Sequence, residues 1–159
     1  MLRLATENDF DFVYQLYMHP LVNRYLLYEM MEAEDFRPIA QELFDKKQIF
    51  IYENENKPAG MCKLVPQHYR DAHKVYLGGL AIHPDNAGKG EGGKMMEEII
   101  AYCRKKNFLR IDLSVSTENE KAIRLYERAG FVREGLMKKF TYLKSENKFL
   151  DEVMMACLL

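Results

Sequence analysis

A glycine-rich loop near the middle of the chain has the residue types and spacing of an anion-binding site. Residues 75 to 83 form a mainly apolar run that predicts a buried strand, and Pro84 ends it. Glycines then lead into a helix-forming stretch, at Gly88, Gly90, Gly92 and Gly93. The first N–H groups of a helix lack intrahelical partners and carry partial positive charge, and glycines let an anion approach them closely. The loop therefore predicts a phosphate or pyrophosphate site.

One interpretation of this loop is a dinucleotide motif. Gly88, Gly90 and Gly93 satisfy the pattern G-x-G-x-x-G, and Asp112 lies near the position of the acidic residue that completes it. However, residues 84 to 87 separate the predicted strand from the first glycine. Too little chain also follows the loop to build the second half of a doubly wound sheet. These departures weigh against a dinucleotide fold.

A second interpretation is a nucleotide-binding P-loop. Residues 88 to 94 match its start, G-x-x-x-x-G-K. The next residue must be Ser or Thr to hold magnesium, but it is Met95. Glu91 would also add a negative charge to the phosphate cradle. This motif is therefore incomplete.

The loop also resembles the pyrophosphate loop of the Gcn5-related N-acetyltransferases (GNAT), Q/R-x-x-G-x-G/A. In residues 87 to 92, AGKGEG, the two glycine positions are occupied by Gly90 and Gly92. Ala87 stands in place of the usual Gln or Arg, and Glu91 in place of an aliphatic residue. Nearby positive charge is available from Lys89 and Lys94.

A second stretch decides among these interpretations. Residues 119 to 131, NEKAIRLYERAGF, resemble the GNAT signature N-x-x-A-x-x-x-Y-x-x-x-G-F, with matches at Asn119, Ala122, Tyr126, Gly130 and Phe131. The two motifs occur in the family's order, separated by one predicted helix and one predicted strand. The chain is thus identified as similar to GNAT acetyltransferases.

The remaining pattern fits one domain of this fold over residues 1–159. The expected class is α/β (α+β), a mixed and mostly antiparallel sheet flanked by helices in the order βααβββαβαββ. Strands are expected at residues 2–5, 48–53, 59–65, 75–83, 109–115, 131–143 and 149–158. Helices are expected after Thr6, after Asp35 as an N-cap, after the glycine loop, and at residues 119–129, where Gly130 ends the last one.

The resemblance implies where acetyl-CoA binds. In GNAT proteins the central strand splays away from the next strand, and acetyl-CoA inserts between them. Backbone groups of Leu80, Ala81 and Ile82 are then expected to hold the pantetheine arm and polarise the thioester. The diphosphate is assigned to Ala87, Gly88, Lys89, Gly90, Gly92, Gly93 and Lys94. Gly78 and Gly79 indicate either a bulge in the central strand or a site of close packing.

The resemblance also implies a catalytic role for Tyr126 as the acid that protonates the CoA thiolate. A phenol of pKa ~10 giving its proton to a thiolate of pKa ~8.5 is uphill by about 2 kcal/mol, so transfer concerted with C–S cleavage is expected. Core packing alone would also explain a tyrosine at this helical spacing. Asn119 lies two turns earlier, ~10 Å along the same face. It is expected to contact the cofactor arm, to cap the helix, or both.

The acceptor is less well defined by the sequence. Glu29, Glu32 and His83 are candidate bases, and Tyr28, Glu29 and Glu32 are candidate substrate contacts. The acidic stretch at residues 29–35 favours a cationic amine, although a charge run is also typical of a solvated face. An amino acid, a polyamine or a peptide N-terminus fits equally. The alternative to an enzyme is a GNAT domain that binds acyl-CoA without turnover.

Composition narrows the class of partner. A net charge of -1 gives no basic excess for nucleic acid, and no apolar run is long enough to span a membrane. The N-terminus has no signal-peptide pattern. An odd number of cysteines far apart in sequence favours reduced thiols in the cytoplasm. The histidines show no metal-ligand spacing, so no metal is expected. The oligomeric state stays open, although GNAT proteins are often homodimers.

Overall fold

The computed structural model describes residues 1–159 as a seven-stranded sheet with the order β1-β2-β3-β4-β5-β7-β6. The strands are β1 Leu2–Leu4, β2 Ile49–Asn54, β3 Lys57–Pro66, β4 Lys74–Ile82, β5 Arg110–Ser116, β6 Val132–Leu143 and β7 Lys148–Leu158. The helices are α1 Phe10–Tyr17, α2 Ala33–Asp45, α3 Glu91–Lys105 and α4 Glu120–Arg128. Every neighbouring pair is antiparallel except β4 and β5, which run parallel. No helix has both the length and the apolar character needed to cross a bilayer.

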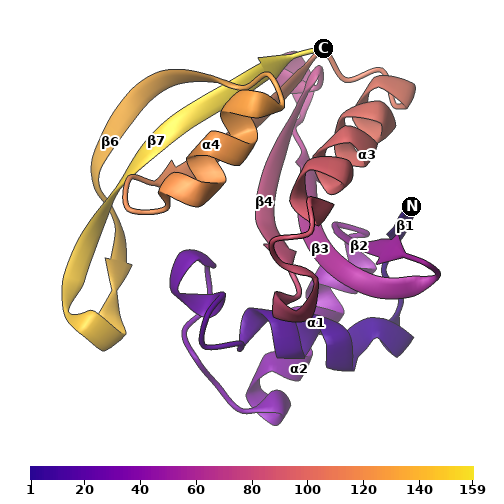
Figure 1. The fold of residues 1–159 in the computed structure, drawn as a ribbon, viewed down its shortest axis with the longest axis vertical. Coiled ribbons are helices and arrows are strands. Elements are labelled where there is room, and N and C mark those ends of the chain that lie inside the picture. Colours follow the sequence, from indigo (N-terminus) through magenta and orange to yellow (C-terminus); the bar gives the residue numbers. More distant parts are fainter.

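Side chains that alternate along the strands build a separate core on each face of the sheet. One core joins α3 and α4 to inward-facing residues such as Leu77, Leu113 and Met155. The other joins α1 and α2 to residues such as Ile51 and Met61. Figure 1 shows α3 beside β4, α4 beside the β6–β7 hairpin, and α1 and α2 together at the bottom of the view. The two faces therefore carry different helices, which is the layered arrangement expected from the sequence.

The predicted order of elements is confirmed, with one correction at the second helix. α2 begins at Ala33 with Glu32 as its N-cap residue, so the prediction of Asp35 as the cap is wrong. Asp35 instead lies in the first turn of the helix, where a negative charge also interacts favourably with the helix dipole. Helical structure begins after Thr6 and Gly130 follows α4, as predicted; Thr6 forms a capping box with Asp9, and Gly130 has φ +98.

β4 and β5 separate soon after they meet, as the resemblance implies. Their parallel pairing covers only Lys74↔Arg110, Val75↔Ile111 and Tyr76↔Asp112. β4 then continues to Ile82 and β5 to Ser116 without further pairing. Where the pairing ends, the hydroxyl groups of Tyr76 and Ser114 share a hydrogen bond of 2.9 Å between the strands. This contact ties the strands together where the opening begins.

A β-bulge interrupts β4 on its other side, against β3. Met61 pairs with Ala81 and Lys63 pairs with Gly78, so Gly79 and Leu80 together oppose Cys62. Gly79 has φ +54, and a Cβ added there would lie 2.8 Å from the Tyr17 hydroxyl oxygen. Both interpretations of the paired glycines therefore hold, because the bulge and the close packing occur together.

Candidate active site

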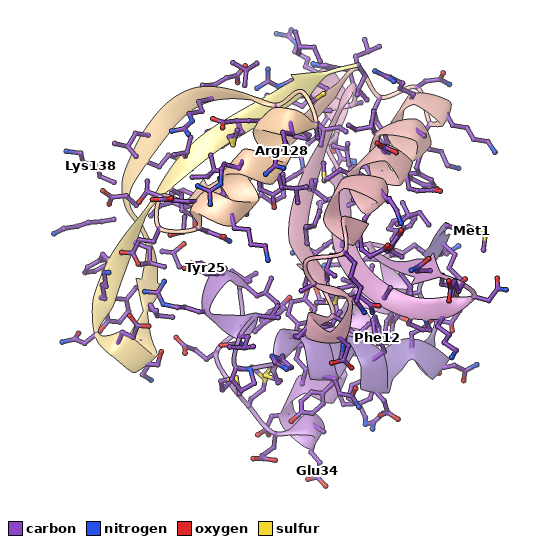
Figure 2. All side chains as sticks on the ribbon, in the orientation of Figure 1. Met1, Phe12, Tyr25, Glu34, Arg128 and Lys138 are labelled. Carbon is purple, nitrogen blue, oxygen red and sulfur yellow. The ribbon has the colours of Figure 1, made fainter.

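The opening between β4 and β5 contains a cavity of about 220 Å³. Its walls come from β3, β4, β5, α4, the β6–β7 hairpin and the segment between α1 and α2. In Figure 1 the hairpin and β4 come together at the top and diverge downward, and the segment after α1 rises toward that opening. Figure 2 shows Tyr25, one of the lining residues, at the tip of this segment below α4.

Tyr126 lies on α4 with its ring in the core and lines this cavity. The residue is 8 % exposed, and its ring lies 5.9 Å from that of Phe131. Its hydroxyl takes part in none of the side-chain hydrogen bonds, yet no buried polar side-chain atom lacks a partner. The hydroxyl is therefore open to the cavity. Burial raises the pKa of Tyr126 well above that of a free phenol, so the group stays protonated.

Asn119 precedes α4 and lines the same cavity. Its Oδ1 accepts a hydrogen bond of 3.2 Å from the Ala122 N–H, which confirms the predicted N-cap. The amide NH₂ of Asn119 has no partner in the protein and stays available as a donor. The predicted contact with a cofactor arm is compatible with the cap, because the two use different atoms of the side chain.

The glycine loop presents a row of unused backbone donors at the start of α3. The N–H groups of residues 88 to 92 donate no hydrogen bond within the protein. Gly88 and Gly90 have φ of +78 and +80, which only glycine adopts readily. Residues 87 to 90 are exposed, so an anion can reach these donors. A Cβ at Gly92 would lie 3.3 Å from Leu125 Cδ2, so this glycine allows α3 and α4 to approach closely.

Glu91 is held within this region by two partners. The side chain is 3 % exposed; its Oε2 accepts from the Tyr52 hydroxyl and its Oε1 from Lys94 Nζ, both at 2.8 Å. Lys94, and then the Tyr52 hydrogen bond, lower the pKa of Glu91. The negative charge therefore persists beside the loop, but Lys94 neutralises it and is itself engaged.

Only some of the predicted cofactor-binding and substrate-binding residues line this cavity. Leu80 lines it, whereas Ala81 packs into the α1–α2 core and Ile82 against the α3–α4 core. Glu32 and His83 line a different cavity of about 590 Å³ beside α1.

Two further predicted residues also lie outside the lining. Glu29 accepts a hydrogen bond of 3.2 Å from the Lys144 N–H in the β6–β7 turn. Tyr28 packs edge-on against Tyr17, with ring centroids 5.2 Å apart, and burial raises its pKa. The candidate bases Glu29, Glu32 and His83 are therefore absent from the lining of the cavity between β4 and β5.

Several lining residues were not anticipated from the sequence: Tyr17, Lys63, Tyr76, Ser114 and Glu152. Lys63 interrupts an apolar run in its strand, and this interruption is the signal that could have singled it out; Glu152 follows another charged residue, Asp151, and carries no such signal. Tyr17 and Tyr76 carry no such signal, because aromatic residues are common in cores.

Comparison with known proteins identifies the family to which this protein belongs. Residues 10–131 match the model of the acetyltransferase (GNAT) family, which covers more than half of the chain. The protein therefore belongs to the GNAT family and is an acetyltransferase.

The names of its relatives give different substrates. The chain is 31% identical to spermidine N(1)-acetyltransferase of Escherichia coli over 147 residues, covering 87% of this chain and 76% of that protein. It is 34% identical over 108 residues to mycothiol acetyltransferase of Propionibacterium freudenreichii, covering 64% of this chain and 33% of that protein, so it spans only a third of that relative. The crystal structure of spermidine N-acetyltransferase from Vibrio cholerae in complex with CoA and spermine superposes with a TM-score of 0.85 at 22% identity, covering 99% of this chain and 94% of that one. This last likeness supports the fold alone.

Proposed function

We propose that this protein transfers the acetyl group of acetyl-CoA to a primary amine by direct attack of the amine on the thioester. The cavity between the separated strands carries the proposal, because Tyr126 and the unpaired part of β4 both line it. Acetyl-CoA would supply the activated thioester. The chain's own residues then bind it, orient it and provide a proton.

The residues present fit that cosubstrate. Five consecutive N–H groups at residues 88 to 92 lack protein acceptors, which suits a diphosphate at the start of α3. Beyond Tyr76, β4 has no strand partner on its β5 side, so alternate residues among Leu80, Ala81 and Ile82 direct backbone groups into the opening. The pantetheine arm of acetyl-CoA would be held by hydrogen bonds to such groups. Asn119 adds a free amide donor from α4.

Tyr126 is proposed to protonate the departing thiolate. Burial raises its pKa, which makes a free proton transfer to a thiol of pKa ~8.5 more unfavourable than the sequence alone indicates. The proton therefore moves as the C–S bond breaks and negative charge develops on sulfur. A hydroxyl without a protein hydrogen bond is suited to this role, since it has no partner to give up.

The acceptor is proposed to be the amine of a small molecule or a peptide N-terminus, and the cytoplasm is the proposed compartment. The free thiols of Cys62, Cys103 and Cys157 support a reducing environment. A homodimer, as in many GNAT proteins, stays a prediction that sedimentation can test. The alternative function is acyl-CoA binding without turnover, which the replacement of the usual loop residues by Ala87 and Glu91 favours.

Thermal shift with acetyl-CoA, NAD and Mg-ATP tests the proposal first. Stabilisation by acetyl-CoA alone is expected, because ligands that bind only the native state raise the melting temperature. Release of CoA thiol with a panel of amines then separates an enzyme from a binding domain. Stabilisation without thiol release from any amine would favour the binding domain, and stabilisation by NAD or Mg-ATP instead would contradict both.

Replacement of Glu91 by glutamine is expected to tighten acetyl-CoA binding about threefold at low ionic strength, and the gain should fade as salt is added. The change removes the negative charge beside the loop and frees Lys94, while the glutamine carbonyl can still accept from Tyr52. Calorimetric titration at several salt concentrations measures it. Glu97→Gln, on an exposed position of the same helix, is the control. Weaker binding by Glu91→Gln alone would mean that the carboxylate orders the loop.

A further inference from the structure

Three charged side chains line the cavity between β4 and β5: Arg24, Lys63 and Glu152. They differ in how many hydrogen bonds and ion pairs they form within the protein. Arg24 is committed, because its Nε donates to Glu146 at 2.8 Å and its Nη2 to Glu118 at 2.9 Å. Those bonds join the segment between α1 and α2 to the β6–β7 turn and to the loop between β5 and α4. Lys63 and Glu152 are therefore the charges left to meet a bound molecule.

Lys63 has no ion pair and no side-chain hydrogen bond in the protein. It lies on β3 opposite Gly78, next to the bulge, and its Cε is 3.6 Å from where a Cβ of Gly78 would be. The side chain is half-buried, and burial lowers its pKa. A cation removed from water without a partner is costly, and an anionic group on a ligand would offset that cost.

Glu152 lies on the other side of the opening, on β7 opposite Ser116 of β5. Its Oε1 accepts from the Thr141 hydroxyl at 2.7 Å, while Oε2 has no protein partner. Glu152 forms no ion pair with Lys63, because β4 and β5 lie between their strands. At this level β4 and β5 are no longer paired, so the two backbones lie farther apart than three paired interstrand steps of ~4.8 Å. The cavity thus presents a cation on one wall and a carboxylate on the opposite wall, with space between them.

We propose that the acceptor is a small zwitterionic amine, a free α-amino acid or a close analogue, whose carboxylate binds Lys63 and whose ammonium binds Glu152. This inference rests on the proposed acetyl transfer and names its substrate class. A polyamine would bring positive charge toward an unpaired Lys63, whereas an amino acid satisfies both walls. The bound ammonium must first lose one proton to water, because only the neutral amine attacks the thioester carbon; a second N–H proton leaves as the amide forms, while Tyr126 protonates the CoA sulfur. The neutral amide no longer carries the charge that Glu152 recognises, so the product is held less tightly than the acceptor.

Matched acceptors test the assignment. CoA thiol release is followed with the standard L-amino acids, with the amides of those that react, and with spermidine. At least one amino acid is expected to exceed its own amide and spermidine by about tenfold or more in kcat/KM, which is the gain typical of one charge-assisted contact. An amide or spermidine that reacts as well as every amino acid would overturn the proposal.

Variants of Lys63 and Glu152 then test which residue causes the preference for an amino acid over its amide. Lys63→Met is expected to lower kcat/KM for the amino acid about 10- to 30-fold, mainly through KM, and to change the amide less than about threefold. Lys63→Arg should keep most of the preference. Lys57→Met, an exposed position on the same strand, is the matched control. Glu152→Gln should weaken the amino acid and the amide alike, because both carry the ammonium.

One result for Lys63→Met would contradict the proposed role of Lys63 in binding the acceptor carboxylate. An equal loss of kcat with acids and amides would assign Lys63 to catalysis and refute the proposal. Folding of each variant is checked by its thermal shift with acetyl-CoA. Failure of the underlying function would look different, since no amine of any kind would then release thiol.

Discussion

Replacement of Tyr126 by phenylalanine is expected to lower kcat about 100-fold, within the range that general acids contribute. The change removes one oxygen atom that faces the cavity and makes no protein hydrogen bond. The ring still fills its place against Phe131, so the core and the shape of the cavity are retained. Acetyl-CoA affinity should therefore stay within about threefold and the melting temperature should be nearly unchanged. Steady-state kinetics, calorimetric titration and thermal denaturation measure the three quantities.

The pH profile adds a second readout of the same residue. Burial raises the pKa of Tyr126, so its acidic form persists throughout an ordinary assay range. Activity should thus rise with pH as the acceptor amine loses its proton, with no fall from Tyr126 up to about pH 10. Tyr126→Phe should lower the whole curve without moving its midpoint. A descending limb near neutral pH that vanishes in the variant would contradict a buried, protonated phenol.

Tyr102→Phe is the matched control for this substitution. Tyr102 lies on α3 with its ring 4.9 Å from that of Phe50, and it does not line the cavity. Its replacement should leave kcat unchanged. If Tyr126→Phe retains full kcat, the tyrosine serves packing only and another group, or water, protonates the thiolate.

The predictable parts of this protein are those encoded by neighbouring residues. The glycine loop, the capped start of α4 and its end at Gly130 follow from local backbone rules, and the structure reproduces all three. The start of α2 was misplaced by three residues because the acidic residues at its start all suit a first helical turn. Neighbouring residues therefore predict that a helix forms, but they do not fix the residue at which it begins.

The cavity itself depends on pairings between distant segments, which no local pattern specifies. Lys63 and Glu152 face one opening only because β3, β4, β5 and β7 are adjacent in that order. The separation of β4 from β5 was expected from family resemblance, not from the residues. The acidic stretch at residues 29–35 was assigned to the acceptor site by composition, yet Glu29 accepts a hydrogen bond from the β6–β7 turn and Glu32 lines a different cavity. The charge of a stretch does not by itself predict which site its side chains will line.

Replacement of Gly79 by alanine is expected to lower both stability and kcat/KM, the latter by about 100-fold, as seen when a transition-state donor is displaced. The native φ of +54 is unfavourable for alanine by about 1–2 kcal/mol. In addition, the new Cβ would lie 2.8 Å from the hydroxyl oxygen of Tyr17, a residue that is 1% exposed. Because Tyr17 is enclosed in the core, β4 must yield. Relief of the bulge by one residue would turn Leu80 to Ile82 toward the wrong faces of the strand.

A double variant separates the two causes of this loss. Tyr17→Phe removes the oxygen that meets the new Cβ, so Tyr17→Phe combined with Gly79→Ala should recover part of the melting temperature. The strain of the positive φ remains, so the recovery is incomplete. Gly135→Ala is the control, since a Cβ there meets nothing within 4 Å and its φ is not positive. Wild-type stability and kcat/KM in Gly79→Ala would mean that the bulge does not position the β4 backbone for acetyl transfer. Loss of kcat/KM without loss of acetyl-CoA affinity would instead locate the effect at the thioester, because the glycine loop proposed to bind the diphosphate lies beyond the end of β4.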